Sequence, residues 1–333
     1  KTNSTSKDLL LTLATPVEAG QVVEVSYAPR SGANLTDVLG NPAAPVTDFA
    51  VSNQTAPTHQ LAPSDVNYTL PNGPVYTVRG NALDNTLTGN TNVNKMYGGD
   101  GNDTLNGGAG DYLYGENGND TLVIAPGYAR LFGGQGDDRY LINANSSYNG
   151  LDTLVYEQAG EGVDTVVFNQ TDASYSPSSL TLPGNVENLI ARGNVGFMNG
   201  NALNNYLVGS SATGNNINGL AGNDTLVGQG GHDTVQGGDG DDVLAPVLHT
   251  SQLTADTPRV LTGNITLNGG AGADTFVLPE GYVGDYRNAG TRSLYISDFT
   301  RGVDKLSFTL AESAAAPTAV NAVTVTTQAA LTT

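Results

Sequence analysis

The sequence predicts an all-β solenoid, in which short repeats stack along one axis, rather than an ordinary globular domain. Its 333 residues include 43 glycines and only 7% aromatic residues, a composition that argues against one large core. A period of nine is the second observation: Gly80, Gly89, Gly98 and Gly107 fall in register when the chain is compared with itself. The chain therefore reads as a repeat protein.

The charge of the chain points to cations as partners. Asp and Glu outnumber Lys and Arg by 32 to 13, and the net charge of −19 opposes binding to nucleic acid or to an anionic lipid surface. The absence of cysteine excludes disulfides and thiolate metal sites. Because no apolar run approaches 18 residues, we expect no direct insertion into a membrane.

The eighth position of each repeat is always apolar, as expected of a side chain that enters a core. In the first block it holds Leu87, Met96, Leu105, Leu113, Leu122, Leu131 and Tyr140. In the second block it holds Leu189, Met198, Leu207, Ile217, Leu226, Val235 and Leu244, and the pattern resumes at Leu267 and Phe276. This position predicts one buried residue in each repeat.

The sixth position carries a polar side chain with an oxygen donor, two residues before the predicted core residue. In the first block these are Asn85, Asn94, Asp103, Asp111, Asp120 and Asp138. In the second block we assign Asn205, Asn216, Asp224, Asp233, Asp242 and Asp274. Carboxylate and amide oxygens recurring at a fixed spacing are typical of a site for a hard cation.

The nonapeptides GGDGNDTLN, GGQGDDRYL, GGDGDDVLA and GGAGADTFV resemble the pattern G-G-x-G-x-D-x-U-x of the RTX, or hemolysin-type, calcium-binding repeat proteins. The resemblance covers about residues 75 to 310. It implies a parallel β-roll or β-helix solenoid in which two repeats form one coil and several Ca²⁺ ions lie between successive turns. The metal ligands it implies are Asn85, Gly98, Asp100, Asp103, Asp111, Gly115, Asp120, Gly133, Asp138, Asn205, Asp224, Asp233, Gly237, Asp239, Asp242 and Asp274.

A physical argument supports calcium at these turns. Alternate repeats turn on the same edge, so Asp103, Asp120 and Asp138 would stack at the strand spacing of ~4.8 Å and repel by roughly 3 to 4 kcal/mol per pair at an effective dielectric of ~20. A hard cation converts that repulsion into a bridge. We expect calcium to be denser on this edge, which continues through Asn205, Asp224 and Asp242, and through Asp274 if the 14-residue insertion at 246–259 loops out, than on the edge with Asn94, Asp111 and Ala129.

The stretches between and after the blocks are predicted to continue the solenoid. Short β-rich segments around Leu154, Val166, Leu182 and Leu189 have wider spacing and are expected to form broader coils. The segment LYISDFTRGVDKLSF at 294–308 is similar to the closing strands of RTX rolls and is expected to cover the last coil as an aromatic hairpin.

The ends of the chain differ from the repeats. Residues 1–56 resemble part of an SWM-type, immunoglobulin-like β-sandwich module of bacterial surface proteins, with three strands predicted between residues 8 and 53. A linker is predicted at 57–74 and a tail or linker at 311–333. Because three strands cannot close a sandwich, the missing strands are expected from residues preceding Lys1 or from a neighbouring subunit, with residues 320–327 as a candidate donor.

No catalytic motif is recognisable, so the chain is predicted not to be an enzyme: H-E-x-x-H, G-x-S-x-G and a cysteine nucleophile are all absent. The scattered His59, His232 and His249 do not suggest a zinc site. Tyr112, Tyr114, Tyr128 and Tyr140 are interpreted either as a sugar-binding face or as strand side chains making lateral contacts.

Two functions are compatible with these features. The first is a secreted, calcium-binding structural protein of the bacterial cell exterior, such as an S-layer, adhesin or filament subunit, with self-association or neighbouring surface subunits as partners. The second is the secretion and folding carrier of a type I-secreted exoenzyme whose catalytic domain lies outside this chain.

Overall fold

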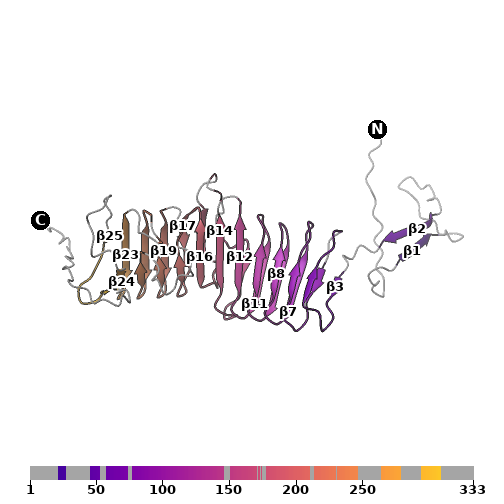
Figure 1. The fold of residues 1–333 in the computed structure, drawn as a ribbon, viewed down its shortest axis with the longest axis horizontal. Coiled ribbons are helices and arrows are strands. Elements are labelled where there is room, and N and C mark those ends of the chain that lie inside the picture. Colours follow the sequence, from indigo (N-terminus) through magenta and orange to yellow (C-terminus); the bar gives the residue numbers. More distant parts are fainter. Residues whose placement is uncertain are drawn as a thin grey trace, which may run out of the picture.

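The protein is all-β in the parts that the structure describes. The computed structural model describes residues 22–27, 46–52, 58–73, 77–145, 151–170, 172, 174, 178–210, 214–229, 231–246, 264–278 and 294–308. These residues form 26 strands and no helix. From β3 onward the strands lie side by side along the long axis of the molecule (Figure 1).

The even-numbered strands after β2 form one parallel sheet of 12 strands, which we call the long sheet. In chain order it consists of β4 (Asn67–Thr69), β6 (Thr86–Thr88), β8 (Thr104–Gly107), β10 (Thr121–Ile124), β12 (Arg139–Ala144), β14 (Thr165–Gln170), β16 (Asn188–Gly193), β18 (Tyr206–Val208), β20 (Thr225–Val227), β22 (Val243–Ala245), β24 (Thr275–Leu278) and β26 (Lys305–Phe308). It runs unbroken from Asn67 to Phe308.

The odd-numbered strands after β1 form two parallel sheets of six strands each, one after the other. The first short sheet contains β3 (Thr58–Gln60), β5 (Thr77–Arg79), β7 (Lys95–Asp100), β9 (Tyr112–Asn117), β11 (Arg130–Gln135) and β13 (Val155–Tyr156). The second contains β15 (Ser178–Thr181), β17 (Val195–Asn199), β19 (Asn216–Ala221), β21 (Thr234–Asp239), β23 (Ile265–Ala271) and β25 (Leu294–Ile296). The chain therefore alternates between the long sheet and a short sheet.

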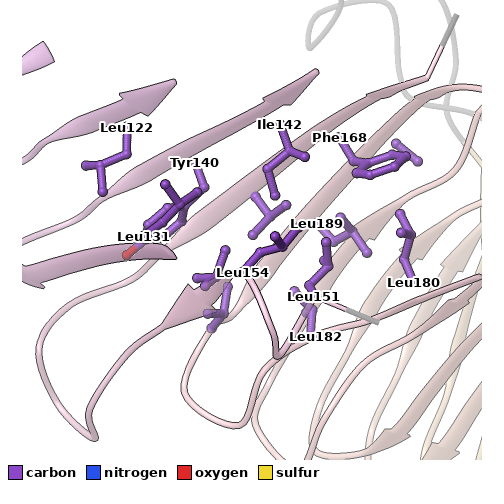
Figure 2. Close-up of a cluster of buried hydrophobic side chains, with 14 of the residues drawn as sticks. Leu122, Leu131, Tyr140, Ile142, Leu151, Leu154, Phe168, Leu180, Leu182 and Leu189 are labelled. Atoms are coloured by element: carbon purple, nitrogen blue, oxygen red, sulfur yellow. The ribbon is translucent and has the colours of Figure 1, made fainter. Parts of the chain in front are cut away.

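The repeat register predicted from the sequence is confirmed. Leu122 pairs with Leu105 and with Tyr140, so residues one coil apart lie directly beside one another. Every eighth-position residue of both blocks is fully buried. They form one continuous core, part of which is shown in Figure 2. Because successive side chains of a strand point to opposite faces, alternate residues enter this core, so that Ile124 joins Leu122 in β10 and Ile142 joins Tyr140 in β12.

The broader coils between the two blocks are confirmed as part of the same solenoid. Leu154, Val166, Leu182 and Leu189 are all buried in the common core. The strand β14 pairs in parallel with both β12 and β16, so the long sheet continues across this stretch. The short sheets are not continuous across this stretch, since the first ends at β13 and the second begins at β15.

The expected hairpin at the C-terminal end of the roll is wrong. The strand β25 pairs in parallel with β23, and β26 pairs in parallel with β24, so the two strands belong to different sheets and add one more coil. Phe299, between them, lies 6.1 Å from the ring of Phe276 and partly covers the core. The aromatic residue closes the roll, but within a parallel coil.

Ordered coils begin before residue 75. The strands β3 and β4 lie in the segment predicted as a linker and pair in parallel with β5 and β6. At the N-terminus, β1 (Val22–Tyr27) and β2 (Val46–Ser52) form an antiparallel pair. The first strand predicted after residue 8, the side chains of β1 and β2, residues 247–259 of the insertion expected at 246–259, and the tail at 311–333 lie outside the described residues.

The tyrosines of the first short sheet contact their neighbours along the stack. Tyr97, Tyr114, Phe132 and Tyr156 stack face to face with centroid distances of 4.6 to 4.9 Å. Because the ring faces are occupied by one another, this arrangement supports the lateral-contact interpretation over a sugar platform. Tyr140 is instead a core residue.

Candidate metal centre

One edge of the solenoid carries a column of acidic and amide side chains, each in the turn that leads from a short sheet into the long sheet. We call it the edge column; in chain order it consists of Asn85, Asp103, Asp120, Asp138, Asp164, Glu187, Asn205, Asp224, Asp242, Asp274 and Asp304. The first four and Asp164 are almost completely buried, as are Asn205, Asp224, Asp242 and Asp274. Each coil thus places one oxygen-bearing side chain on the same line.

A ladder of hydrogen bonds holds the edge column in register. The backbone N–H of Asp103 donates to Asp120 Oδ1 at 2.6 Å, and that of Asp120 donates to Asp138 Oδ1 at 2.7 Å. The same bond recurs from Asn85 to Glu187 and from Asn205 to Asp304, with lengths up to 3.1 Å. One oxygen of each carboxylate is therefore fixed by the preceding coil.

The second carboxylate oxygen has no hydrogen-bond partner in five members of the column. These buried, unpartnered atoms are Oδ2 of Asp103, Asp120, Asp138, Asp224 and Asp242. An unsatisfied buried acceptor is costly, and in a native protein it calls for a ligand. The five residues lie at the same point of five coils, so the unsatisfied oxygens repeat along the column.

Glycine leaves open the space at which each unpartnered oxygen points. A Cβ atom on Gly115 would overlap both Asp120 Oδ2 and the carbonyl oxygen of Gly133 in the next coil. Gly98, Gly219 and Gly237 form the same arrangement with the corresponding aspartate and the following glycine. We call each such space a cradle. Its donors, a carboxylate and a backbone carbonyl, fit Ca²⁺, which prefers oxygen ligands of both kinds.

Burial disfavours the charged form of the carboxylates of the column when no cation is present. It raises their pKa to about 6 for Asp103 and Asp224, to about 7 for Asp138 and Asp242, and to about 8 for Asp120. For Asp120 the neighbouring carboxylates of Asp138 and Asp103 contribute further to the rise. The negative charge of the column is therefore neutralised either by protons or by a bound cation.

A dependence of stability on pH follows for the metal-free protein. Because these pKa values are raised above the ordinary value of ~3.9, the folded chain binds more protons than the unfolded chain between about pH 4 and pH 8. We expect its melting temperature to be highest near pH 4 and to fall as the pH rises through 6 to 8. Circular dichroism of decalcified protein across this range measures the effect, and saturating calcium should abolish the fall. A melting temperature that rises with pH in the metal-free protein contradicts the assignment.

The asparagines of the column are satisfied without a cation. Asn85 Oδ1 accepts a hydrogen bond from the backbone N–H of Asn81 at 2.8 Å, and Asn205 Oδ1 accepts one from Asn201 at 2.7 Å. The amide nitrogen of Asn85 donates to the carbonyl of Asp65 at 3.1 Å. These two positions close their own cradles by hydrogen bonds, so the geometry favours the aspartates as ligands.

The opposite edge differs from the edge column. Asp111 Oδ1 accepts a hydrogen bond from Asn94 N at 2.7 Å, and its Oδ2 accepts one from Gly108 N at 2.7 Å. Asp233 Oδ1 accepts a bond from the backbone N–H of Asn215 at 2.8 Å. In the part of the chain that the structure describes, the buried unpartnered aspartate oxygens all belong to the edge column. This asymmetry supports the expected preference of calcium for one edge.

The sequence assignment of one sixth-position residue is wrong. Asn215 is buried two residues before Ile217 and makes the hydrogen bonds of that position, whereas Asn216 is an exposed strand residue. The one-residue insertion in this repeat had displaced the assignment. The third-position residues Asp100 and Asp239 are exposed at the ends of β7 and β21. Asp100 accepts a hydrogen bond from Asn117 Nδ2 at 2.8 Å.

The sequence reasoning missed three members of the edge column: Asp164, Glu187 and Asp304. Each precedes a core residue of the long sheet by two positions, at Val166, Leu189 and Leu306. An acidic residue two positions before an apolar one was therefore the available signal. It was overlooked because the glycines that mark the other repeats are incomplete in these coils.

The residue before each aspartate has a structural role of its own. Asn119 N donates to Asn102 Oδ1 at 2.7 Å, and Asp137 N donates to Asn119 Oδ1 at 2.9 Å. The same ladder recurs at Asn204, Asn223 and Asp241. The recurring Asn-Asp pair thus forms two parallel ladders, and the side chains of these asparagines serve as acceptors within the fold.

Comparison with known proteins identifies the repeats. The family model of the RTX calcium-binding nonapeptide repeat matches four copies, at residues 79–112, 111–123, 210–244 and 261–278. The chain therefore carries RTX repeats, which bind Ca²⁺ and are typical of secreted proteins. It is also similar to the endo-1,3-1,4-beta-glycanase ExsH of Rhizobium meliloti (strain 1021), with 40% identity over 111 residues. Those residues are 33% of this chain and 19% of the glycanase, so the chain spans about a fifth of that relative.

Within the described residues, no helix is long and apolar enough to span a bilayer.

Proposed function

We propose that the chain is a calcium-stiffened structural rod of a secreted bacterial protein, a building unit of an S-layer, adhesin or filament. The observation that carries the proposal is the long sheet, which passes through every described coil from β4 to β26 with the cradles along one edge. Twelve strands at ~4.8 Å spacing give a rod roughly 50 Å long. Such a body has the form of a spacer.

The residues of the edge column link each coil to the next. Asp120 offers Oδ2 from one coil and Gly133 offers its carbonyl from the following one, while Asp138 Oδ1 holds the backbone of Asp120. Bound calcium supplies the positive charge that turns the repulsion between stacked carboxylates into attraction. We propose that the chain crosses the calcium-poor cell interior unfolded and folds outside, as a type I-secreted protein would.

Self-association is the second part of the proposal. The antiparallel pair of β1 and β2 suits part of a β-sandwich, and an edge strand of such a pair can accept a strand from another molecule. Strands supplied by a neighbouring subunit would join the rods head to tail, and a heterologous contact of that kind propagates into a lattice or filament.

An alternative function is favoured by one comparison. The similarity to an endo-1,3-1,4-beta-glycanase, over a fifth of that enzyme, suits a role as the folding and secretion carrier of an exoenzyme. In that case the catalytic domain lies outside this chain, and the rod has no need to assemble.

Sedimentation and hydrolysis assays distinguish the two functions. In millimolar calcium we expect the purified chain to form species larger than a monomer, which dissociate when the calcium is chelated, and not to hydrolyse a 1,3-1,4-β-glycan. A calcium-bound chain that remains monomeric, and that raises the secretion of an enzyme fused to it, supports the carrier. Hydrolysis by the purified chain contradicts both.

A further inference from the structure

The cradle between Gly133 and Asp138 is built differently from the others. Leu131 pairs with Val155 and Phe132 with Tyr156, so the next residue, Glu157, occupies the place that Gly133 holds one coil earlier. In the regular cradles this place belongs to a glycine that offers a backbone carbonyl. Here a carboxylate replaces it, at the end of the first short sheet.

The side chain of Glu157 turns toward the cradle of Asp138. A Cβ atom on Gly133 would overlap Asp138 Oδ2 and Tyr140 Oη and lie 2.5 Å from Glu157 Oε1, so the three oxygens surround one point. One carboxylate oxygen each from Asp138, Glu157 and Asp164 also lie within 4.8 Å of one another. Three side chains thus meet at this cradle and Asp164 lies beside two of them, whereas the regular coils supply one side chain and one carbonyl.

These oxygens are buried and lack partners within the protein. Tyr140 is fully buried and Asp138 is 2% exposed, yet Tyr140 Oη and Asp138 Oδ2 make no hydrogen bond. Both carboxylate oxygens of Glu157 are likewise buried and accept no hydrogen bond from an N–H or hydroxyl donor, and a hydrogen bond between Glu157 and Glu161 forms only if one of the two acids is protonated. Figure 2 shows Tyr140 beside Leu131 within the cluster of buried apolar side chains. A phenol that packs among leucines and places an unsatisfied oxygen beside the carboxylates of Asp138 and Glu157 points to a ligand.

We propose that Asp138, Tyr140, Glu157 and Asp164 form a separate calcium site, ligated mainly by side chains, which binds more tightly than the regular cradles. The donors are all oxygen, which suits a hard cation, and a site with more carboxylates binds Ca²⁺ more strongly. The site lies at the end of the first short sheet, and its ion would join the coil of β11 and β12, which carries Asp138 and Tyr140, to the coil of β13 and β14, which carries Glu157 and Asp164. The inference needs no assembly of rods, so it is independent of the structural role proposed above.

Calcium titration of the full-length chain, followed by calorimetry, tests the proposal. For the wild type we expect one ion bound at least tenfold more tightly than the remainder. Glu157→Gln should remove this tight phase while leaving the weaker phase and the circular dichroism in saturating calcium unchanged. Glu157→Gly, which restores the residue of the regular repeats, should convert the site to the weaker class. Asp152→Asn, an exposed acid in the same coil, is the matched control and should bind as the wild type.

Terbium supplies a second readout. Bound Tb³⁺ is excited by a tyrosine at its site, and the chain has no tryptophan. Tyr140→Phe keeps the packed ring and removes only the oxygen, so we expect it to lower the emission of the first ion bound. A tight phase and an emission unchanged in Glu157→Gln and Tyr140→Phe overturn the site. Monomeric rods with the tight phase intact would overturn the assembly proposal alone.

Discussion

Removal of calcium at pH 7.5 is expected to abolish most of the β-sheet signal of the chain. Without a cation, the column stacks carboxylates whose Oδ2 atoms are buried and unpartnered, from Asp103 to Asp138 and again at Asp224 and Asp242. Extracellular calcium modules bind at ~10⁻⁴–10⁻³ M, and a site formed only on folding makes its binding energy folding energy. Circular dichroism in chelator, then in millimolar calcium, measures the transition.

Magnesium at equal concentration is the control for that experiment. Because Mg²⁺ demands a small octahedral shell and dehydrates reluctantly, we expect it to restore much less structure than calcium. Strand signal that is already complete in chelator would contradict calcium-driven folding.

Gly115→Ala is expected to weaken calcium binding by roughly tenfold or more at its cradle, which corresponds to ~1.4 kcal/mol. The added methyl group would overlap Asp120 Oδ2 and the backbone carbonyl of Gly133, the two oxygens that form the cradle. The backbone of Gly115 is not left-handed, so alanine is tolerated there conformationally. The effect should therefore appear in calcium affinity and in the melting temperature of the calcium-bound protein.

Gly184→Ala provides the matched control, because a Cβ atom there meets no neighbour within 4 Å and its backbone is also not left-handed. We expect that variant to bind calcium as the wild type. Equal affinities for Gly115→Ala and Gly184→Ala would show that the space beside Asp120 Oδ2 holds no ion.

The periodic parts of the fold were predictable from the sequence because the residues of each repeat determine which side chain is buried and where the chain turns. An apolar eighth residue such as Leu122 must enter the core, and an aspartate two residues earlier must lie at the turn. The left-handed backbone at Gly101 and Gly136 likewise follows from the glycine of the motif. Since every coil repeats these constraints, small errors in one repeat do not change the architecture.

The features that were not predictable depend on contacts between coils. Whether Asn85 binds a cation or a backbone N–H is decided by the position of Asn81, which the period does not reveal. Glu157 belongs to no repeat, and only the pairing of β11 with β13 places its carboxylate beside Asp138. The closing coil was mistaken for a hairpin because parallel and antiparallel strands have the same short apolar pattern.

The positions of bound calcium ions in a crystal of the full-length chain test the central claim most directly. Anomalous scattering near the calcium edge distinguishes these ions from water. The account predicts peaks in the cradles of Gly98, Gly115, Gly219 and Gly237, each in contact with the Oδ2 atom of the neighbouring aspartate, and fewer at Asp111 and Asp233 on the opposite edge. Ions spread evenly over both edges, or none beside Asp120, would contradict it.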